Sequence, residues 1–95
     1  MASVLTCVAR VRDWHALREL HRQALLDQAR EAGATRFRVF RNVRDASLAL
    51  LVAEGPESEA LEELARALGA RLQALPGAQP ADDRLWEAAD WETLG

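Results

Sequence analysis

The stretch from Leu48 to Ala53 places six apolar residues in a row, and this run constrains the fold more than any other feature. Side chains of a β-strand alternate between the two faces of a sheet, so an unbroken apolar run predicts a strand that is covered on both faces. The stretch from Val4 to Val11 is also apolar on both alternating faces and is rich in β-branched residues. Two strands of the predicted sheet therefore need covering layers on both sides.

Helix and strand signals alternate along the chain. Asp13 is placed to cap a helical pattern that runs from Trp14 to Ala32 and stops at Gly33. The expected elements are a strand at 4–11, a helix at 14–32, strands at 35–43 and 47–54, a helix from 56–58 to 75, a loop at 76–83 and a strand at 84–91. This β-α-β-β-α-β order predicts an α+β, ferredoxin-like fold, with an antiparallel sheet and both helices on one face. The 95 residues make one such domain, spanning 1–95.

Two helices can cover only one face of a four-stranded sheet. In the first strand Val4 and Val8 point away from Leu5 and Cys7, and the strand at 47–54 repeats this two-sided apolar pattern. A bare apolar sheet face is too large a patch for a soluble monomer. We therefore expect a second copy to pack sheet against sheet, as a two-fold homodimer that closes a dimeric α/β barrel.

Composition excludes several classes of protein. No apolar run approaches the roughly 20 residues of a membrane span, and the first residues lack the pattern of a signal peptide, so we expect a cytoplasmic protein without a membrane partner. One cysteine rules out an internal disulfide. Two scattered histidines and one cysteine give no recognisable zinc site, so no metal is expected.

Charge is divided unevenly along the chain. Residues 1–44 hold nine arginines and four acidic residues, whereas residues 45–95 hold three arginines and eleven acidic residues. Such asymmetry is found on anion- or nucleic-acid-binding surfaces and also in the complementary halves of a self-associating domain. The second interpretation is favoured because no block of consecutive like charges exists.

A family resemblance rests on three parts of the chain. These are Val11-Arg12-Asp13-Trp14, the helix end Ala32-Gly33-Ala34-Thr35, and the strand Arg38-Val39-Phe40-Arg41-Asn42-Val43. Together with an apolar strand that ends in Glu54, they resemble the dimeric α/β-barrel superfamily, and within it the small antibiotic-biosynthesis-monooxygenase-like proteins. The resemblance implies two ferredoxin-like protomers, each with a small cavity between its helices and its sheet.

The resemblance implies a range of activities: cofactor-independent oxygenation of polycyclic phenols, haem degradation and isomerisation. The family also includes members without a known reaction. This chain has no tyrosine and no asparagine on its first strand, which separates it from the oxygenases and the haem degraders respectively. The function expected from the resemblance is binding of a small aromatic or carbonyl compound in the helix–sheet cavity, with cofactor-independent, monooxygenase-like chemistry and no cofactor. The alternative is a non-catalytic dimeric module for ligand sensing or structure.

The first helix carries the main candidate site residues. Projected at 100° per residue, Leu17 and Leu20 mark its buried stripe, Trp14 lies at the leading edge, and His21 and Gln28 fall within the stripe. Two buried polar groups on one stripe predict a polar cavity, with His21 as the acid/base residue and Trp14 and Gln28 as ligand contacts. The competing interpretation is a hydrogen-bonded histidine in a filled core.

The strands supply further candidates for ligand contact. Arg38 and Asn42 share one face of their strand and are expected to hold a carbonyl or anion, or else to pair with acidic residues across an interface. Trp86 and Trp91 are predicted on opposite faces of the last strand, with one of them, Trp86 in our assignment, stacking on a flat ligand. Cys7 is expected to behave as a small buried hydrophobe.

Nucleic-acid binding is a third alternative that the pattern argues against. Ferredoxin-like RNA-recognition motifs stack bases on aromatic residues of the first and third strands. Here those strands are aliphatic, and the net charge is −3.

Overall fold

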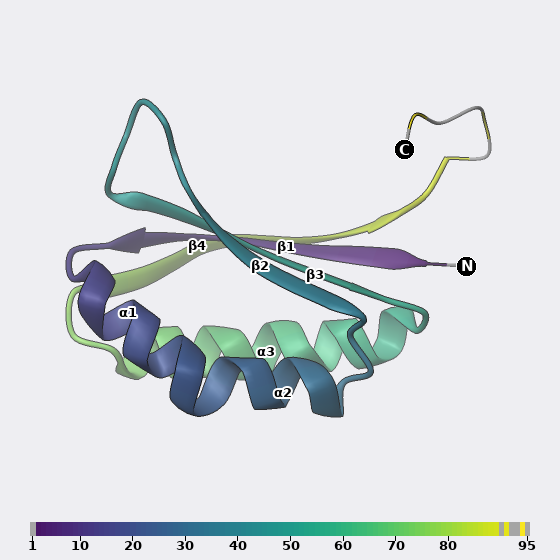
Figure 1. Ribbon diagram of the computed structural model, residues 1–95, viewed down its shortest axis with the longest axis horizontal. Coiled ribbons are helices and arrows are strands. Elements are labelled where there is room, and N and C mark those ends of the chain that lie inside the picture. Colours follow the sequence, from purple (N-terminus) through teal and green to yellow (C-terminus); the bar gives the residue numbers. More distant parts are fainter. Residues whose placement is uncertain (1, 90, 92–93, 95) are drawn as a thin grey trace.

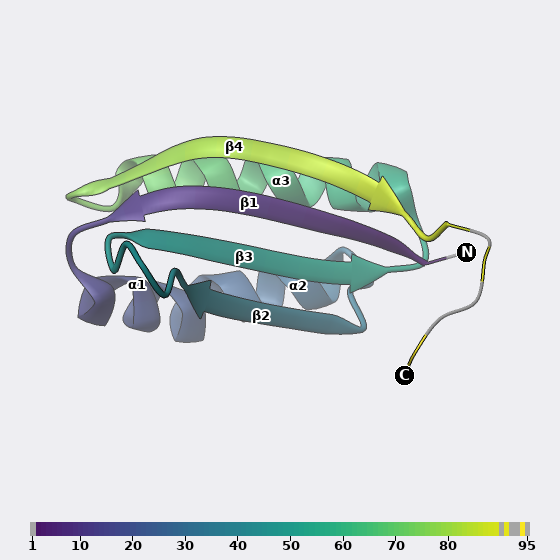
Figure 2. The ribbon, with the colours of Figure 1, turned by 90° about the horizontal axis from the view of Figure 1, so that it is seen from above.

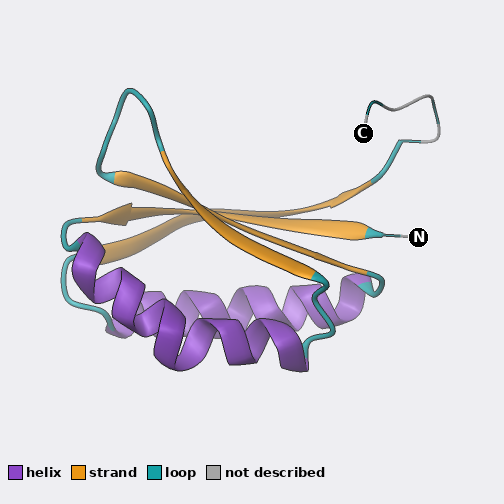
Figure 3. Cartoon of the chain, in the orientation of Figure 1, coloured by secondary structure: helices purple, strands orange, loops and turns teal. Residues whose placement is uncertain are grey.

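The computed structural model describes residues 2–89, 91 and 94. Four antiparallel strands form one sheet in the order β2-β3-β1-β4, and the helices cover one of its faces (Figures 1 and 3). The elements are β1 (Ser3–Val11), α1 (Trp14–Leu20), the π-helical segment η1 (His21–Leu25), α2 (Leu26–Glu31), β2 (Arg36–Arg41), β3 (Leu48–Gly55), α3 (Ser58–Ala74) and β4 (Ala78–Glu87). This is the ferredoxin-like α+β fold predicted from the order of elements.

The core lies between the sheet and the helices. Leu5 and Cys7 of β1 and Leu51 of β3 point toward the helices, each at most 6% exposed. From the other side α3 contributes an apolar stripe, and α1, η1 and α2 contribute buried leucine and alanine side chains. The buried residues of the helices are Leu17, Leu25, Ala29, Leu61, Leu64, Ala65, Leu68 and Leu72.

The first helix is capped as predicted but changes its phase in the middle. Asp13 accepts a hydrogen bond from the Ala16 amide at 3.0 Å, and Gly33 ends the helical region with a φ of 79°. Between them, in η1, the Leu26 amide donates to the carbonyl of His21, five residues earlier instead of four. A π-helical turn absorbs one extra residue, which rotates every later side chain by about 100° relative to an unbroken helix. The buried positions are therefore 17, 25 and 29, and Gln28 leaves the stripe that holds His21.

The last strand begins earlier than the sequence predicts. The expected loop at 76–83 is largely strand, because β4 runs from Ala78 to Glu87, and Trp91 lies outside the sheet with 79% of its surface exposed. Pro80 is tolerated there because β4 is an edge strand. A register shift opposite Val8 and Ala9 adds one residue to β4. The prediction that Trp86 and Trp91 occupy opposite faces of one strand is therefore wrong.

The face of the sheet away from the helices, called here the outer face, is uncovered in a single copy (Figure 2). Val8 and Leu50 are register partners at its centre, and both remain partly exposed. Around them lie Val4, Val52, Leu48, Phe40 and Trp86. No helix among the described residues is long and apolar enough to cross a membrane.

Candidate functional site

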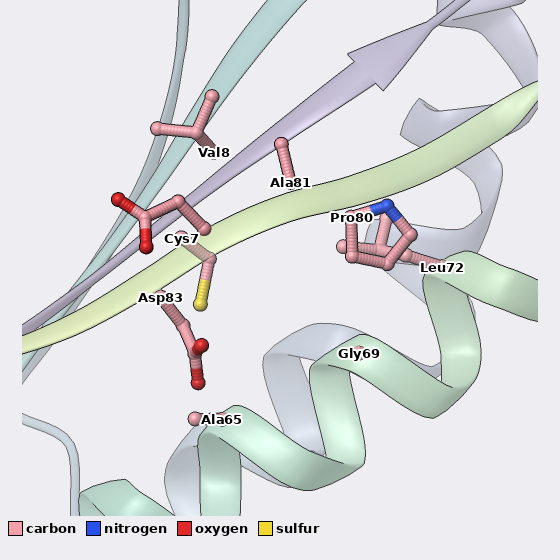
Figure 4. A pocket seen from close by; sticks show the side chains of 9 residues that line it. Cys7, Val8, Ala65, Gly69, Leu72, Pro80, Ala81 and Asp83 are labelled. Atoms are coloured by element: carbon pink, nitrogen blue, oxygen red, sulfur yellow. The ribbon is translucent and has the colours of Figure 1, made fainter.

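A pocket opens between α3 and the strands β1 and β4, and we call it the α3–β4 pocket (Figure 4). Its volume is about 170 Å³. The strands contribute mixed polar and apolar groups, whereas α3 contributes small or apolar side chains. The lining residues are Cys7, Val8, Ala65, Gly69, Leu72, Pro80, Ala81, Asp82 and Asp83.

Local sequence explains why space remains at this point. On the side of α3 that faces β4, Ala65 and Gly69 are small, and a Cβ atom added at Gly69 would meet nothing within 4 Å. On the other side, the extra residue in β4 changes the alternation of its side chains, so that Asp83 is the register partner of Cys7 and faces the helix. Figure 4 shows the Asp83 carboxylate pointing from β4 toward Ala65, with the Cys7 sulfur beside it.

The pocket has a negative electrostatic character. Burial, and then the charges of Asp83 and Asp82, raise the pKa of the Cys7 thiol to about 11. The thiol is therefore protonated at neutral pH and is not an activated nucleophile, which agrees with the expectation of a small buried hydrophobe. Asp82 forms an ion pair with Arg84 at 2.8 Å. Asp83 has no ion-pair partner within 4 Å among the described side chains.

His21 lies on the opposite side of the helical layer from this pocket, over β2. Its ring stacks on Phe37 at 5.5 Å between centroids, with 14° between the two planes. Partial burial lowers the pKa of His21, so the imidazole is neutral at pH 7. A neutral imidazole can accept a proton, and the catalytic role predicted for His21 stays a prediction.

Gln28 is not brought together with His21, because of the π-helical turn between them. It lines a groove between α2 and α3, with Glu31 and Glu63 at its edges. Its Oε1 atom is buried, and no described residue forms a hydrogen bond with it. The two polar groups that the regular projection placed in one cavity therefore face different neighbours, β2 and α3 respectively.

The side chains of Trp14 and Asn42 form contacts that stabilise the hairpin between β2 and β3. The Trp14 indole donates to the Ala46 carbonyl at 2.8 Å, and the guanidinium of Arg41 lies 4.3 Å from the centre of the Trp14 ring. The Asn42 side-chain oxygen accepts from the amides of Arg44 and Asp45 at 2.9 and 2.8 Å. These contacts give both residues a structural task, because they hold the turn in place.

The remaining candidates, Arg38 and Trp86, lie on the outer face. The Arg38 guanidinium is 5.2 Å from the centre of the Phe40 ring, and the Trp86 indole donates to the Thr6 hydroxyl at 2.8 Å. Close to Phe40, an open apolar groove of about 530 Å³ runs along the hairpin. It is lined by Val8, Phe40, Arg41, Asn42, Val43, Leu48, Ala49 and Leu50. The six predicted site residues thus lie in several places and do not form one cluster.

Sequence reasoning missed the residues that shape the α3–β4 pocket. Asp83 falls in the loop expected at 76–83, whereas the structure places it in β4, where its side chain is exposed and borders the pocket. Gly69 is the sequence feature that indicates this pocket, because a glycine inside a strongly periodic helix costs about 1 kcal/mol relative to alanine and therefore has a packing or functional reason. Within the described part of the chain, no three His, Cys, Asp or Glu side chains gather to hold a metal ion.

The fold and pocket together define a ferredoxin-like α+β protein with a small cavity between its sheet and its helices. No family model and no curated protein matches the sequence. Solved structures match over nearly the whole chain. A candidate antibiotic biosynthesis monooxygenase from Deinococcus radiodurans is 16% identical, with a TM-score of 0.62 and coverage of 100% of this chain and 99% of that one.

Two further solved structures have the same architecture. A dimeric ferredoxin-like protein from an uncultured marine organism is 12% identical, with a TM-score of 0.61 over 97% of this chain and 98% of that one. A conserved protein of unknown function from Bacteroides thetaiotaomicron, described as a candidate oxidoreductase, is 16% identical, with a TM-score of 0.56 over 88% and 92%. The ferredoxin-like architecture expected from the resemblance to antibiotic-biosynthesis-monooxygenase-like proteins is thereby confirmed.

Proposed function

We propose that the protein binds a small organic molecule in the α3–β4 pocket. The observation that carries this proposal is a partly open pocket in which small and apolar side chains of α3 lie opposite the exposed carboxylate of Asp83. Ligand pockets combine these two features, since apolar walls supply affinity and a few polar groups fix the orientation of the ligand. The ligand therefore carries a hydrogen-bond donor on a compact apolar body.

The volume of the pocket limits the size of that body. An engineered apolar cavity of roughly 150 Å³ holds one benzene molecule. The α3–β4 pocket, at about 170 Å³, accommodates one ring with a short substituent. The ligand class is therefore a single-ring compound, or an aliphatic molecule of similar volume, with a donor group placed to reach Asp83.

The proposal includes self-association through the outer face. Val8, Leu50 and their apolar neighbours are uncovered in one copy, and a second sheet packed on them removes this surface from water. The dimeric state named for the marine protein with this fold supports the same arrangement here. The walls that α3, Cys7 and Asp83 give to the α3–β4 pocket lie away from the outer face, whereas Val8 belongs both to the pocket and to the surface that a second copy would cover.

Titration with benzyl alcohol, followed by the amide NMR signals of the protein, tests the binding site. We expect the signals of Cys7, Ala65 and Gly69 to shift, and the shifts to disappear in Gly69→Leu, whose side chain fills the pocket. Ala70→Leu, one position further along the exposed side of α3, is the matched control and should bind like the wild type. Shifts that survive in Gly69→Leu, or none in the wild type, would contradict the proposal.

Oxygenation of the bound ring is a second candidate function, favoured by the fold shared with the Deinococcus protein. In a reaction without a cofactor the substrate supplies the electrons. A phenol and O₂ then give a quinone and water: the ring loses four electrons, gains one oxygen atom, and the second oxygen leaves as water. The chain must supply a base for the phenol proton: Asp83 if the ring lies in the α3–β4 pocket, or His21, as predicted from the sequence, if the ring binds instead beside β2.

An oxygen electrode separates this candidate from a binding module. Oxygen uptake with phenol that is lost in Asp83→Asn assigns the base to the pocket, and uptake lost only in His21→Ala assigns it to His21. A wild-type protein that binds phenol without consuming oxygen is a non-catalytic ligand-binding module.

A further inference from the structure

Two diagonally opposite corners of the sheet rise on the side of the outer face (Figures 1 and 2). One is the hairpin between β2 and β3, residues 40–48, which we call the hairpin corner. The other is the end of β4, residues 84–87, which we call the β4 corner. They lie on opposite edges of the sheet, because β2 and β4 are its edge strands. A second sheet that packs against the outer face therefore meets these two corners.

The hairpin corner is hollow, whereas the β4 corner carries a large aromatic side chain. The open groove of about 530 Å³ lies at the hairpin corner, where Phe40, Val43 and Leu50 supply apolar walls. At the β4 corner, 50% of the surface of Trp86 is exposed, although its indole nitrogen donates a hydrogen bond to Thr6. Each corner thus presents apolar surface that a single copy leaves in water.

The charges at the two ends of the strands differ in sign. In the described strand ends and loops, the hairpin end holds four arginines and two aspartates, and the opposite end holds three glutamates and one arginine. These residues are Arg10, Arg12, Asp13, Arg41, Arg44 and Asp45 at the hairpin end, and Arg36, Glu54, Glu57 and Glu87 at the opposite end. At the corners themselves Arg44 and Glu87 are exposed, and neither forms an ion pair with another described residue. The hairpin end therefore attracts the opposite end of a second copy and repels its own counterpart.

Two arrangements bring the raised corners into contact when identical sheets pack face to face about a two-fold axis. In the first, each hairpin corner meets the hairpin corner of the second copy, which brings two Arg44 side chains together and sets one hollow against another. In the second, each hairpin corner meets the β4 corner of the second copy, which brings Arg44 toward Glu87 and Trp86 over the hollow. Only the second arrangement joins opposite charges and fills the groove with an apolar side chain.

We infer that the occupant of the hairpin groove is the β4 corner of a second copy of this chain, with Trp86 of one copy packed against Phe40 and Val43 of the other. This inference rests on the proposed self-association and adds which surfaces meet. Two-fold symmetry makes the contact occur twice in each pair. Tryptophan is enriched among the side chains that contribute most to interfaces, so Trp86→Ala should raise the Kd of the pair by about tenfold or more.

Distances between spin labels distinguish the two arrangements. All labelled proteins carry Cys7→Ala, so that the label reacts only with an introduced cysteine. With labels at Val43→Cys, pulsed electron paramagnetic resonance should give a distance within the pair of more than half of the 40 Å long axis of one copy, because the two hairpins lie at opposite ends of the pair. In a mixed pair of Val43→Cys and Ala88→Cys, the distance should be shorter than that between two Val43→Cys labels.

Charge reversal tests the same contact through affinity. Arg44→Glu and Glu87→Arg should each raise the Kd of the pair by about threefold, since each replaces an attraction at the surface by a repulsion. The double variant restores opposite charges at both contacts and should bind like the wild type. Ala70→Glu, on the exposed side of α3, is the control and should leave the Kd unchanged. Sedimentation equilibrium measures the Kd, and thermal unfolding of each variant confirms that the fold is intact.

The outcomes separate this inference from the proposed self-association. A short distance between two Val43→Cys labels shows that the hairpins meet each other, which overturns the inference and leaves the pair standing. A pair whose Kd is unchanged in Trp86→Ala, or whose double charge variant is no tighter than the single ones, also overturns the inference. A wild-type protein that stays a single copy at every concentration overturns both.

Discussion

The raised pKa of the buried Cys7 thiol makes the free energy of unfolding depend on pH. Its thiol is 6% exposed, and its pKa is raised to about 11 by burial and by the two neighbouring aspartates. Below pH 9 the thiol is neutral in both the folded and the unfolded chain. Between pH 9 and 11 the unfolded chain ionises while the folded chain does not, so the free energy of unfolding should fall by about 2 to 3 kcal/mol.

This chain is well suited to that measurement, because it has no lysine and no tyrosine and its arginines stay protonated throughout. Urea unfolding at pH 8 and at pH 10.5 provides the comparison. Cys7→Ala is the control, and its stability should be nearly independent of pH in this range. An equal alkaline loss in Cys7→Ala would show that another group causes the effect.

Substitution by alanine should change the free energy of unfolding in opposite directions at two glycines. At Gly69 the helix offers free space and an ordinary backbone conformation, so Gly69→Ala should raise the free energy of unfolding by about 0.5 to 1 kcal/mol. At Gly77 the φ of 77° disfavours any side chain, and an added Cβ lies 3.0 Å from the Cβ of Arg12. Gly77→Ala should therefore lower stability by about 1 kcal/mol or more. Urea midpoints of the two variants measure both signs, and a destabilised Gly69→Ala would mean that the free space does not exist.

At the scale of elements, most of the fold could be predicted because the apolar periodicity is strong. The strand at 4–11, the start of the first helix at Trp14 and the run at 48–53 agree with β1, α1 and β3. The phase of the first helix could not be predicted, since a π-helical turn leaves no recognisable mark in the residues His21 to Leu25. A regular helical projection therefore places Gln28 beside His21. In the structure, the extra residue in the π-helical turn rotates Gln28 toward α3.

The start of β4 could not be predicted from the sequence, for a different reason. Pro80 and the two aspartates at 82 and 83 are typical of loops, and only the edge position of the strand makes them acceptable in a sheet. Edge positions follow from the order of strands in space, which single-sequence patterns do not contain. The α3–β4 pocket depends on this strand, so its key carboxylate could not be found before the fold was known.

The rotated second half of the first helix makes a prediction for Gln28. Its side-chain oxygen is buried and has no hydrogen-bond partner within the described part of the chain, which costs about 1 to 3 kcal/mol relative to a satisfied group. Gln28→Leu keeps the size of the side chain and removes the unsatisfied acceptor, so it should raise the free energy of unfolding by about 1 kcal/mol. Gln23→Leu, at an exposed position of η1, should change stability by less than about 0.5 kcal/mol. A Gln28→Leu variant less stable than the wild type in urea would show that the amide has a partner.

At the scale of the whole molecule, the outer face is the surface through which we propose that two copies pair. Leu50 and Val8 face each other across β3 and β1, in a sheet whose other face is filled by the helices. If two copies pair through this face, a carboxylate at position 50 is taken out of water at the centre of the contact, and the cost of its desolvation opposes pairing. The mass measured by sedimentation equilibrium should then fall from that of a dimer, twice 10.5 kDa, in the wild type to that of a monomer in Leu50→Glu.

The control for this prediction is Ala70→Glu, which adds the same charge to the exposed side of α3 and should leave the mass unchanged. Circular dichroism of Leu50→Glu separates dissociation from unfolding, because a folded single copy keeps its helices. The dimer should also unfold at a temperature that rises with protein concentration, and this dependence should vanish in Leu50→Glu. A wild-type protein that sediments as a single copy at every concentration, or a Leu50→Glu variant that still pairs, would mean that something other than a second sheet covers the outer face.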